Sequence, residues 1–321
     1  MLRIGIVGAG GMGTVHYNNF LHLNDCQVVG IVTRSQSGRA KAVAWGVPAF
    51  GSIAELAAAV DPDVVDVCTP TFCHKQDVLE SLSLGKNTIV EKPCALHEAD
   101  ARQMFDLARE KGVHLYVAQV LQFSREIEVL RTLVEQKTYG EPLDAVFQRL
   151  SARPDWAQGG WLFDREKSGL VPFDLHIHDL DVIASLFGAP EESVCYPCGG
   201  QAGGFRELYR WEYRCGQVNV MAEAGWLNAS IPFTCPWRVY FERAMVIFDG
   251  QTVTAYPHGA DPVVYDTEDP VKIPTGINVP PTGWYYRELG HFLACIRKNE
   301  DSPLVPRDRV LAVLHILEQA V

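Results

Sequence analysis

Hydrophobic positions in the first 120 residues fall into short runs separated by segments with helical spacing. The runs are apolar almost throughout and cover residues 2–7, 28–33, 64–68, 87–90 and 114–117. The helical segments between them cover residues 35–45, 53–60, 74–84 and 97–111. Strands that lack alternation of apolar and polar residues are typical of a sheet covered on both faces. Because strands and helices alternate, we expect an α/β fold with a doubly wound parallel sheet.

The pattern changes after about residue 121, where strands begin to follow one another. Helical patterns and strand-like segments are found in turn at residues 124–135 (helix), 143–151 (strand), 175–187 (helix), 192–256 (strands), 284–297 and 307–319 (helices). Asp249-Gly250 is a turn dipeptide among these strands, whereas the proline-rich residues 262–281 predict a loop. This succession predicts an α+β domain with an open mixed or antiparallel sheet.

The change of pattern also predicts the domain organisation. We expect a doubly wound domain over residues 1–121 and an α+β domain over residues 122–321. The last two helices could pack back on the first domain.

Charge and composition narrow the classes of function. The 321 residues are 47% hydrophobic and 21% charged, and 28 Lys and Arg face 39 Asp and Glu, a net charge of −11. An acidic balance argues against nucleic acid as a partner, because phosphate backbones are bound by clustered basic residues. No apolar run approaches the length of a membrane span, and the N-terminus lacks the pattern of an export signal. We therefore expect no nucleic-acid or membrane partner.

The nine cysteines are an odd number scattered over a long chain. This usage is typical of reduced thiols and predicts a cytoplasmic protein. Cys195 and Cys198 form a lone C-x-x-C motif, and a zinc site would need a second pair of ligands at similar spacing. We expect no metal, with these two thiols as ordinary strand residues, although structural zinc stays the alternative.

A glycine-rich segment follows the first predicted strand. In Gly8-Ala9-Gly10-Gly11-Met12-Gly13 the first glycine permits a tight turn, the second lets the backbone approach a diphosphate, and the third lets the helix pack closely. The amides of the helix N-terminus then face the anion. The segment lies between a strand and a helix, as the dinucleotide-binding motif requires. A glycine turn without a ligand is the alternative.

The end of the second strand bears on the choice of cofactor. An NAD site typically carries Asp or Glu there for the ribose 2′-hydroxyl, whereas this chain has Thr33, Arg34 and Ser35. A guanidinium and two hydroxyls can bind a 2′-phosphate, so NADP is favoured over NAD. Arg34 could instead stack on adenine or point to solvent.

Glu91-Lys92-Pro93 follows another strand of the predicted parallel sheet at its carboxyl edge, where ligands of such sheets bind. Lys92 could direct its ammonium at a substrate oxygen near the nicotinamide. A surface turn is the alternative for this tripeptide.

Asp174 and His178 begin the long helix of the second domain. Residues four apart share one helix face, and a carboxylate near a histidine can orient a general base. His176 lies about 200° from His178 around a helix, so the two rings do not share a metal ion. Asp174 acting as a helix cap is the alternative.

These motifs occur together in an order that resembles the Gfo/Idh/MocA oxidoreductases, the glucose–fructose oxidoreductase and inositol 2-dehydrogenase group. The matching segments are residues 7–13, 65–74, 91–93, 168–181 and 284–292. The sequence departs from the family in its shortened glycine-rich run at 168–170 and in Gln122-Phe123, where many members have arginine before an aromatic residue. These departures leave the substrate open.

The resemblance implies site residues and partners. It assigns Lys92, Asp174 and His178 as catalytic and substrate-binding residues. It assigns the cofactor side to residues that include Thr69, Pro70, His74, Glu91 and Lys92. It also implies that the open sheet of the second domain forms a homodimer or homotetramer.

The expected activity is hydride transfer between NADP or NAD and a secondary hydroxyl or carbonyl of a sugar, inositol or related polyol. His178 would take the hydroxyl proton with help from Lys92, and Asp174 would hold another hydroxyl or orient His178. Trp156 and Trp161 could stack on a sugar ring or be packed in the interior. The alternatives are a non-catalytic nucleotide sensor, an NAD-retaining glycosidase, and a dihydrodiol- or biliverdin-type reductase.

Overall fold

The chain folds into two compact units. The computed structural model describes residues 1–155, 158–201, 204–277 and 279–320. The N-terminal unit joins Met1–Phe123 with Asp269–Leu311, and the C-terminal unit joins Ser124–Glu268 with the residues from Ala312 on. Both units are therefore discontinuous in sequence.

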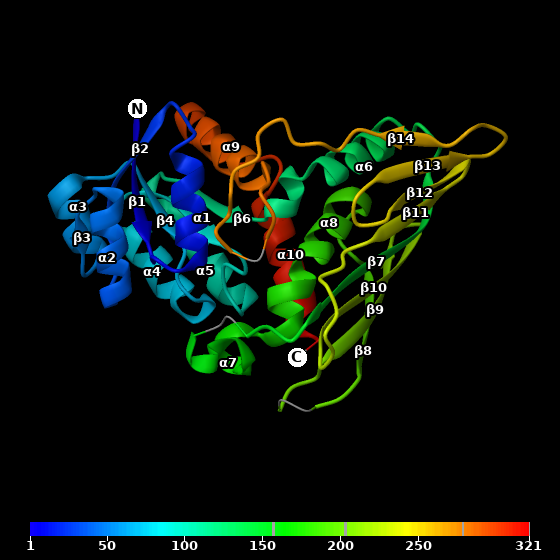
Figure 1. Ribbon diagram of the computed structural model, residues 1–321, viewed down its shortest axis with the longest axis horizontal. Helices are drawn as coiled ribbons and strands as arrows, with labels where there is room; N and C mark the ends of the chain where they lie inside the picture. The colour runs from blue at the N-terminus through cyan, green and yellow to red at the C-terminus, as the bar shows by residue number, and fades with distance from the viewer. Residues whose placement is uncertain (156–157, 202–203, 278, 321) are drawn as a thin grey trace. The chain divides into compact units, whose positions relative to one another are not determined.

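The N-terminal unit is built on a six-stranded parallel sheet in the order β3-β2-β1-β4-β5-β6 (Figure 1). Its strands are β1 (Leu2–Val7), β2 (Cys26–Val32), β3 (Ala49–Phe50), β4 (Val64–Val67), β5 (Asn87–Glu91) and β6 (Leu115–Ala118). The connecting helices are α1 (Gly11–Phe20), α2 (Gln36–Trp45), α3 (Ile53–Val60), α4 (Thr71–Ser83) and α5 (Glu98–Lys111). The predicted doubly wound sheet is confirmed.

The strand order reverses between β1 and β4, and this determines where a ligand can approach. From β1 the sheet continues to β2 and β3, whereas from β4 it continues to β5 and β6. Ligands of such sheets bind outside the carboxyl ends of the strands at the reversal. Gly8, Thr69 and Lys92 directly follow or closely follow β1, β4 and β5, so all three lie at this edge.

Helix α9 (Trp284–Lys298) also belongs to the N-terminal unit, although it comes late in the sequence. It packs against α1 and against the short helix η1 (Val120–Phe123). Tyr285 of α9 is buried with Val15 and Val120, which explains how this distant segment is held.

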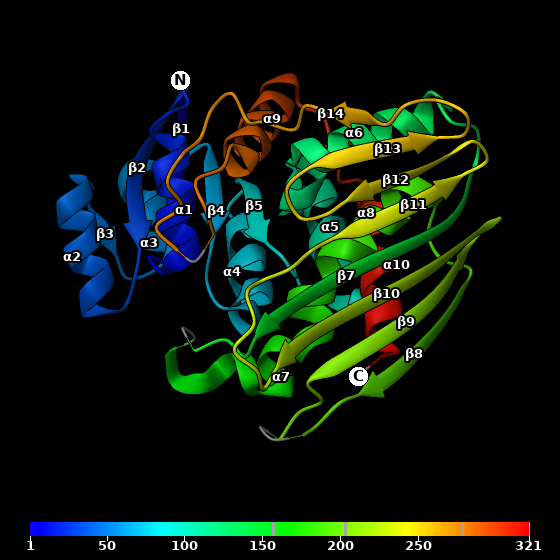
Figure 2. The same cartoon turned by 45° about the vertical axis from the view of Figure 1, so that its right-hand side comes forward.

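The C-terminal unit is built on an eight-stranded mixed sheet in the order β14-β13-β12-β11-β7-β10-β9-β8 (Figure 2). Its strands are β7 (Pro142–Ala152), β8 (Glu192–Cys198), β9 (Leu208–Cys215), β10 (Val218–Leu227), β11 (Trp237–Phe241), β12 (Ala244–Phe248), β13 (Val253–Pro257) and β14 (Val263–Tyr265). Strands β7 and β10 pair in parallel and the other neighbours are antiparallel. The predicted open mixed sheet is confirmed.

Helices cover one face of this sheet. The remaining helices are α6 (Arg125–Glu135), η2 (Gln158–Phe163), α7 (Arg165–Ser168), η3 (Pro172–His176), α8 (Ile177–Phe187) and α10 (Arg307–Glu318). Helix α8 packs against β7 and β10, and α6 packs against α8. Arg149 of β7 forms a buried two-pronged ion pair with Asp179 of α8, with N–O distances of 3.0 and 2.8 Å. A buried guanidinium needs such a partner, so the pair fixes α8 on the sheet.

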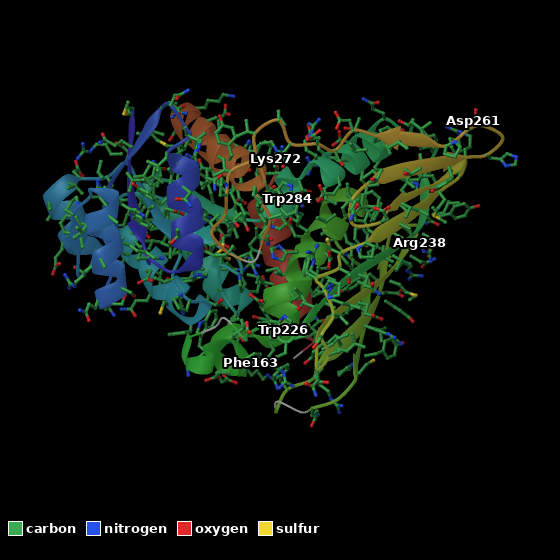
Figure 3. The ribbon with its side chains drawn as sticks, viewed as in Figure 1. Phe163, Trp226, Arg238, Asp261, Lys272 and Trp284 are labelled. Carbon is green, nitrogen blue, oxygen red and sulfur yellow. The ribbon has the colours of Figure 1, made fainter. Side chains whose placement is uncertain are left out.

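The other face of the sheet carries exposed apolar side chains. The strand register places Val194, Tyr196, Met221, Tyr240 and Tyr256 on this same face, and each is 46% to 53% exposed. Ion pairs lie among them, including the one that joins Arg238 to Asp144 (Figure 3). This face has no covering element among the described residues of its own unit, in contrast to the face that carries α8.

Within the described residues, no helix combines the length and the apolar character that crossing a membrane requires.

Candidate active site

The glycine loop between β1 and α1 has the geometry that the three glycine positions predict. Gly8 has a φ of +99°, and a Cβ there would lie 2.8 Å from the carbonyl oxygen of Cys68. A Cβ on Gly13 would lie 2.0 Å from the carbonyl oxygen of Gly8, so helix and loop are in direct backbone contact. A Cβ on Gly10, in contrast, would meet nothing within 4 Å.

The open space beside Gly10 lies at the start of α1. Gly10 is the N-cap of this helix, and no side chain accepts a hydrogen bond from the first-turn amides. Free helix N-terminal amides attract anions. The loop therefore fits a dinucleotide diphosphate, held by the backbone from Gly10 to Gly13 (with Gly11 and Met12 between them).

Lys41 of α2 forms hydrogen bonds with this loop, and the sequence did not predict these contacts. Its Nζ donates to the carbonyl oxygen of Ala9 at 2.9 Å and to Thr14 Oγ1 at 2.7 Å. Lys41 lies on an ordinary helix 28 residues after Gly13, so no local motif points to this contact.

In the segment after β2, Ser35 has a structural role and Arg34 is an exposed cation. Ser35 Oγ accepts a hydrogen bond from the Gly38 amide at 3.0 Å and so caps α2. Thr33 is buried, whereas Arg34 is exposed. The charge of Arg34 acts on Asp77 of α4. Burial has the largest influence on the pKa of Asp77 and raises it, whereas the positive charge of Arg34 lowers it. The guanidinium of Arg34 therefore lies within electrostatic range of Asp77 on α4.

His74 connects the loops after β4 and β5. Its ring nitrogens lie 2.8 Å from the carbonyl oxygen of Pro93 and 2.7 Å from that of Thr69. The ring is buried, which lowers the pKa of His74. Thr69 Oγ1 donates to Asp77 at 2.7 Å, and Pro70 is the N-cap of α4. A neutral ring has one N–H, so His74 donates to one of the two carbonyl oxygens while its other nitrogen lies close to the second, and the buried ring is packed between the two loops.

Lys92 stands beside a carboxylate that is itself held in place. The Lys92 amide donates to Glu91 Oε2 at 3.1 Å, and Glu91 Oε1 lies 3.0 Å from His16 Nε2. The Lys92–Pro93 peptide bond is cis. The side chain of Lys92 is partly exposed, whereas Glu91 is buried.

One group of side chains in the N-terminal unit has the composition of a metal site. Ligand atoms of His16, Asp66 and Cys68 lie within 4.8 Å of one another. His16 Nδ1 is 2.9 Å from Asp66 Oδ2, whereas two ligands of a tetrahedral zinc ion would lie about 3.3 Å apart. The shorter distance is that of a hydrogen bond, so the contact fits an ion pair between the two residues better than shared coordination.

The C-terminal unit brings Asp174 and His178 onto one accessible stripe. Between Ser168 and Ala184 these two residues are partly exposed, and all the remaining residues are buried. The spacing of Asp174 and His178 predicts an ordinary α-helix here, and this prediction is wrong for the first turn. Residues Pro172–His176 form a π-helical turn (η3) that leads into α8. Pro172 has no amide hydrogen to donate, and such wider turns are frequent at functional sites.

His176 points away from that stripe. Its Nε2 lies 2.8 Å from the hydroxyl of Tyr213, and its ring stacks on Trp211 at 3.8 Å between centroids. Burial lowers the pKa of His176 to about 3. His176 is therefore a neutral core residue that packs η3 on β9.

The segment before η3 carries the aromatic candidates for sugar stacking. Trp161 is partly exposed in η2, and Trp156 lies outside the described residues. The neighbouring Phe163 packs edge-to-face on Trp226 of β10 with 5.9 Å between ring centroids (Figure 3). This contact anchors the segment that carries Trp161.

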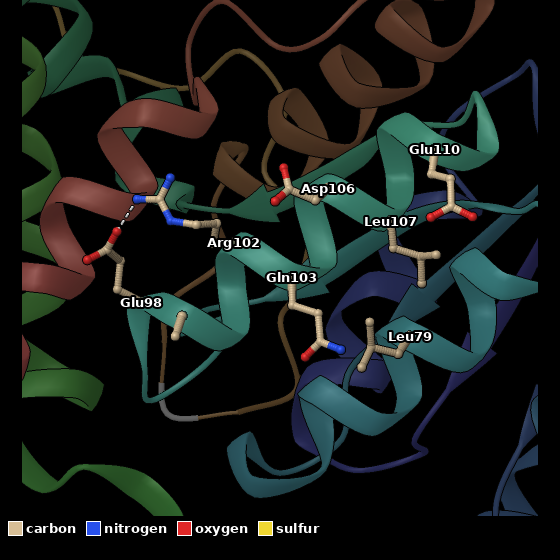
Figure 4. A pocket seen from close by; sticks show the side chains of 8 residues that line it. Leu79, Glu98, Arg102, Gln103, Asp106, Leu107 and Glu110 are labelled. Atoms are coloured by element: carbon tan, nitrogen blue, oxygen red, sulfur yellow. Dashed lines mark hydrogen bonds and ion pairs between the residues drawn. The ribbon is translucent and has the colours of Figure 1, made fainter.

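A separate hollow lies between α4 and α5, on the outside of the N-terminal sheet (Figure 4). It is lined by Leu79, Glu98, Ala99, Arg102, Gln103, Asp106, Leu107 and Glu110. Glu98 and Arg102 in its wall form an ion pair with each other. None of the sequence-predicted site residues lines this hollow.

Comparison with known proteins agrees with both units. A family model described as "Oxidoreductase family, NAD-binding Rossmann fold" matches residues 2–119, and a model described as "GFO/IDH/MocA C-terminal domain" matches residues 127–208. D-glucoside 3-dehydrogenase of Escherichia coli is 31% identical over 195 residues, 59% of this chain and 55% of that protein. Myo-inositol 2-dehydrogenase of Thermotoga maritima is 29% identical over 195 residues, 60% of this chain and 57% of that protein. The match spans about half the length of these curated relatives.

A solved structure extends the comparison of fold to the whole chain. Levoglucosan dehydrogenase in complex with NADH and levoglucosan has a TM-score of 0.85 at 17% identity, over 99% of this chain and 96% of that chain. The fold and the family models place the chain among the oxidoreductase families with an NAD-binding Rossmann fold. The chain belongs to the Gfo/Idh/MocA family.

The glycine loop gives a paired prediction. Gly10→Ala should leave the melting temperature within about 2 °C of the original and weaken dinucleotide binding about tenfold or more, because its methyl group enters the open space at the helix N-terminus. Gly13→Ala should lower the melting temperature itself, because its Cβ must displace the Gly8 carbonyl. Thermal unfolding and fluorescence titration with NADH and NADPH measure both effects, and unchanged binding by Gly10→Ala would contradict the assignment.

Proposed function

We propose that this protein is a dehydrogenase that transfers a hydride between a nicotinamide cofactor and a secondary hydroxyl or carbonyl of a sugar, inositol or related polyol. The observation that carries the proposal is the glycine loop with its open position at Gly10, at the same edge of the sheet as the turn that holds Lys92. The names of the sugar and inositol dehydrogenases at about 30% identity support the substrate class.

Each candidate side chain has a separate role in the proposed reaction. The nicotinamide supplies the hydride acceptor or donor when the cofactor is bound. His178 accepts the proton of the substrate hydroxyl during oxidation, since an imidazole is an effective base near neutral pH. Lys92 places its ammonium beside the same oxygen and stabilises the charge that develops there. Asp174 holds a second hydroxyl or orients His178, and Trp161 contacts the sugar ring.

We propose NADP as the preferred cofactor. Arg34 supports this choice, because it is exposed at the end of β2 where a carboxylate would otherwise bind the ribose. A guanidinium forms strong hydrogen bonds with a phosphate. Thr33 and Ser35 flank Arg34, and Thr69, Pro70, His74 and Glu91 form the nicotinamide side of the site.

We propose that the exposed face of the C-terminal sheet binds a second copy of this chain. Five apolar side chains on one face of the sheet, from four of its strands and with ion pairs among them, resemble a self-complementary interface more than an ordinary surface. The protein would then be a homodimer or homotetramer.

We also propose a cytoplasmic location. All nine cysteines are among the described residues, and none of them forms a disulfide there. Reduced thiols in this number are typical of a reducing compartment.

Lys92→Ala and His178→Asn test the activity. Each should lower kcat about 10²- to 10⁴-fold, because each removes a group that acts on the reacting oxygen. A spectrophotometric screen of sugars and inositols with NADP⁺ and NAD⁺ measures the rates, and Lys86→Ala and His258→Asn serve as controls. Near-normal turnover by Lys92→Ala would overturn the mechanism, and dinucleotide binding without any turnover would favour a sensor.

Arg34→Ala tests the choice of cofactor. The Kd for NADPH should rise about tenfold or more while that for NADH stays within about threefold, because only NADPH carries the 2′-phosphate. Arg39→Ala, which removes an exposed arginine from α2 five residues further along the chain, should change neither. Equal or tighter binding of NADH by the unaltered protein would show that the preference is wrong.

Met221→Arg tests the proposed interface. A charge at the centre of the apolar face should shift the protein toward monomer in light scattering coupled to size exclusion, because an interface cannot easily bury an unpaired charge. Val43, which is 82% exposed on α2, provides the matched control as Val43→Arg. If the unaltered protein is already a monomer at micromolar concentration, the proposal fails.

A further inference from the structure

A buried cluster of ionisable groups lies next to the turn that carries Lys92. His16 comes from α1, Asp66 from β4 and Glu91 from the end of β5, and each is at most 6% exposed. Cys68, at 7%, lies beside the first two. All four residues belong to the N-terminal unit.

The ring of His16 is held between two carboxylates. Its Nδ1 lies 2.9 and 3.1 Å from the two oxygens of Asp66, and its Nε2 lies 3.0 Å from Glu91 Oε1. A carboxylate accepts hydrogen bonds and does not donate them, so both ring nitrogens must carry a proton. A neutral ring has only one N–H, and the geometry therefore calls for an imidazolium.

The electrostatic surroundings agree with this protonation state. Burial has the largest single influence on the pKa of His16 and lowers it, yet the attraction and hydrogen bond of Asp66, together with Cys68, raise it well above the ordinary value. Tyr285 and Glu288 of α9 are the further titratable groups nearby. Without the positive ring, two carboxylates would be buried without compensation, which is costly.

Glu91 connects His16 to the backbone of Lys92. While Oε1 faces His16, Oε2 accepts the hydrogen bond of the Lys92 amide at 3.1 Å. His16 lies one turn beyond Gly13 on α1, the helix whose N-terminus forms the glycine loop. The ring thus connects the helix that would hold the diphosphate with the turn that carries the reactive lysine.

We propose that His16 is a positioning residue that fixes the backbone of Lys92 through Glu91. The ring is fully buried and does not reach substrate, so it acts only through the groups that it binds. The proposal rests on the proposed function in so far as Lys92 is a catalytic residue. The connection from His16 to the Lys92 amide stands independently of any substrate.

Two variants separate positioning from simple stability. His16→Ala removes both contacts. Asp66→Asn removes the negative charge that keeps Nδ1 of His16 protonated. The ring of this variant can still donate a hydrogen bond from Nε2 to Glu91. We expect hydrogen exchange of the Lys92 amide to become about tenfold faster or more in His16→Ala and to stay within about threefold in Asp66→Asn.

Enzyme kinetics provide the second measurement. In His16→Ala we expect kcat to fall about tenfold or more, while the dinucleotide Kd changes less than about threefold. Asp66→Asn should keep kcat within about threefold. If His16→Ala retains kcat and loses only thermal stability, or if it weakens dinucleotide binding by as much as it lowers kcat, the proposal is wrong.

Measurements on the unaltered protein cover the case in which a variant fails to fold. ¹⁵N NMR of histidine-labelled protein at pH 7.5 should show His16 with both nitrogens protonated, and metal analysis should show no stoichiometric zinc. A ring without a proton on Nε2, the nitrogen that faces Glu91, or one zinc per chain would overturn the proposal. Absence of turnover on every substrate, with the Lys92 exchange pattern as expected, would refute the proposed function and leave the positioning role intact.

Discussion

A buried carboxylate in the middle of a parallel sheet has to be neutralised, and this requirement organises the edge where Lys92 lies. Asp66 lies among apolar residues in β4, a strand whose four residues are all buried. Only a cation within hydrogen-bonding distance makes such a position tolerable. His16 provides it from α1, and Glu91 completes the arrangement from β5. The two ionic contacts of one ring thereby connect three separate elements.

The N-terminal fold was predictable because its strands are buried on both faces and its helices alternate with them. Residues 53–60 were predicted with the bounds that the structure gives to α3. Strand β3 was missed because two residues leave no periodic pattern, and β14 was missed because its three residues lie in a proline-rich stretch. The π-helical turn before α8 was missed because the spacing of Asp174 and His178 fits an α-helix equally well.

The candidate site was predictable where a motif is local. Gly8, Gly10 and Gly13 lie close together in sequence, and their backbone geometry follows from the strand-to-helix turn. Lys41 and His16 act on partners that are 27 to 75 residues away along the chain, so no local spacing indicates them. One signal was present for the cluster around His16: an acidic residue in the centre of the apolar run Val64-Val65-Asp66-Val67 implies a buried partner.

The contacts of Lys41 bear on the entropy of dinucleotide association. A loop of glycines has many conformations available, and fixing it on binding would oppose association. In this protein the ammonium of Lys41 already binds the Ala9 carbonyl and the Thr14 hydroxyl, on either side of the loop. The incoming nucleotide therefore meets a preorganised backbone, and more of its interaction energy is retained as affinity.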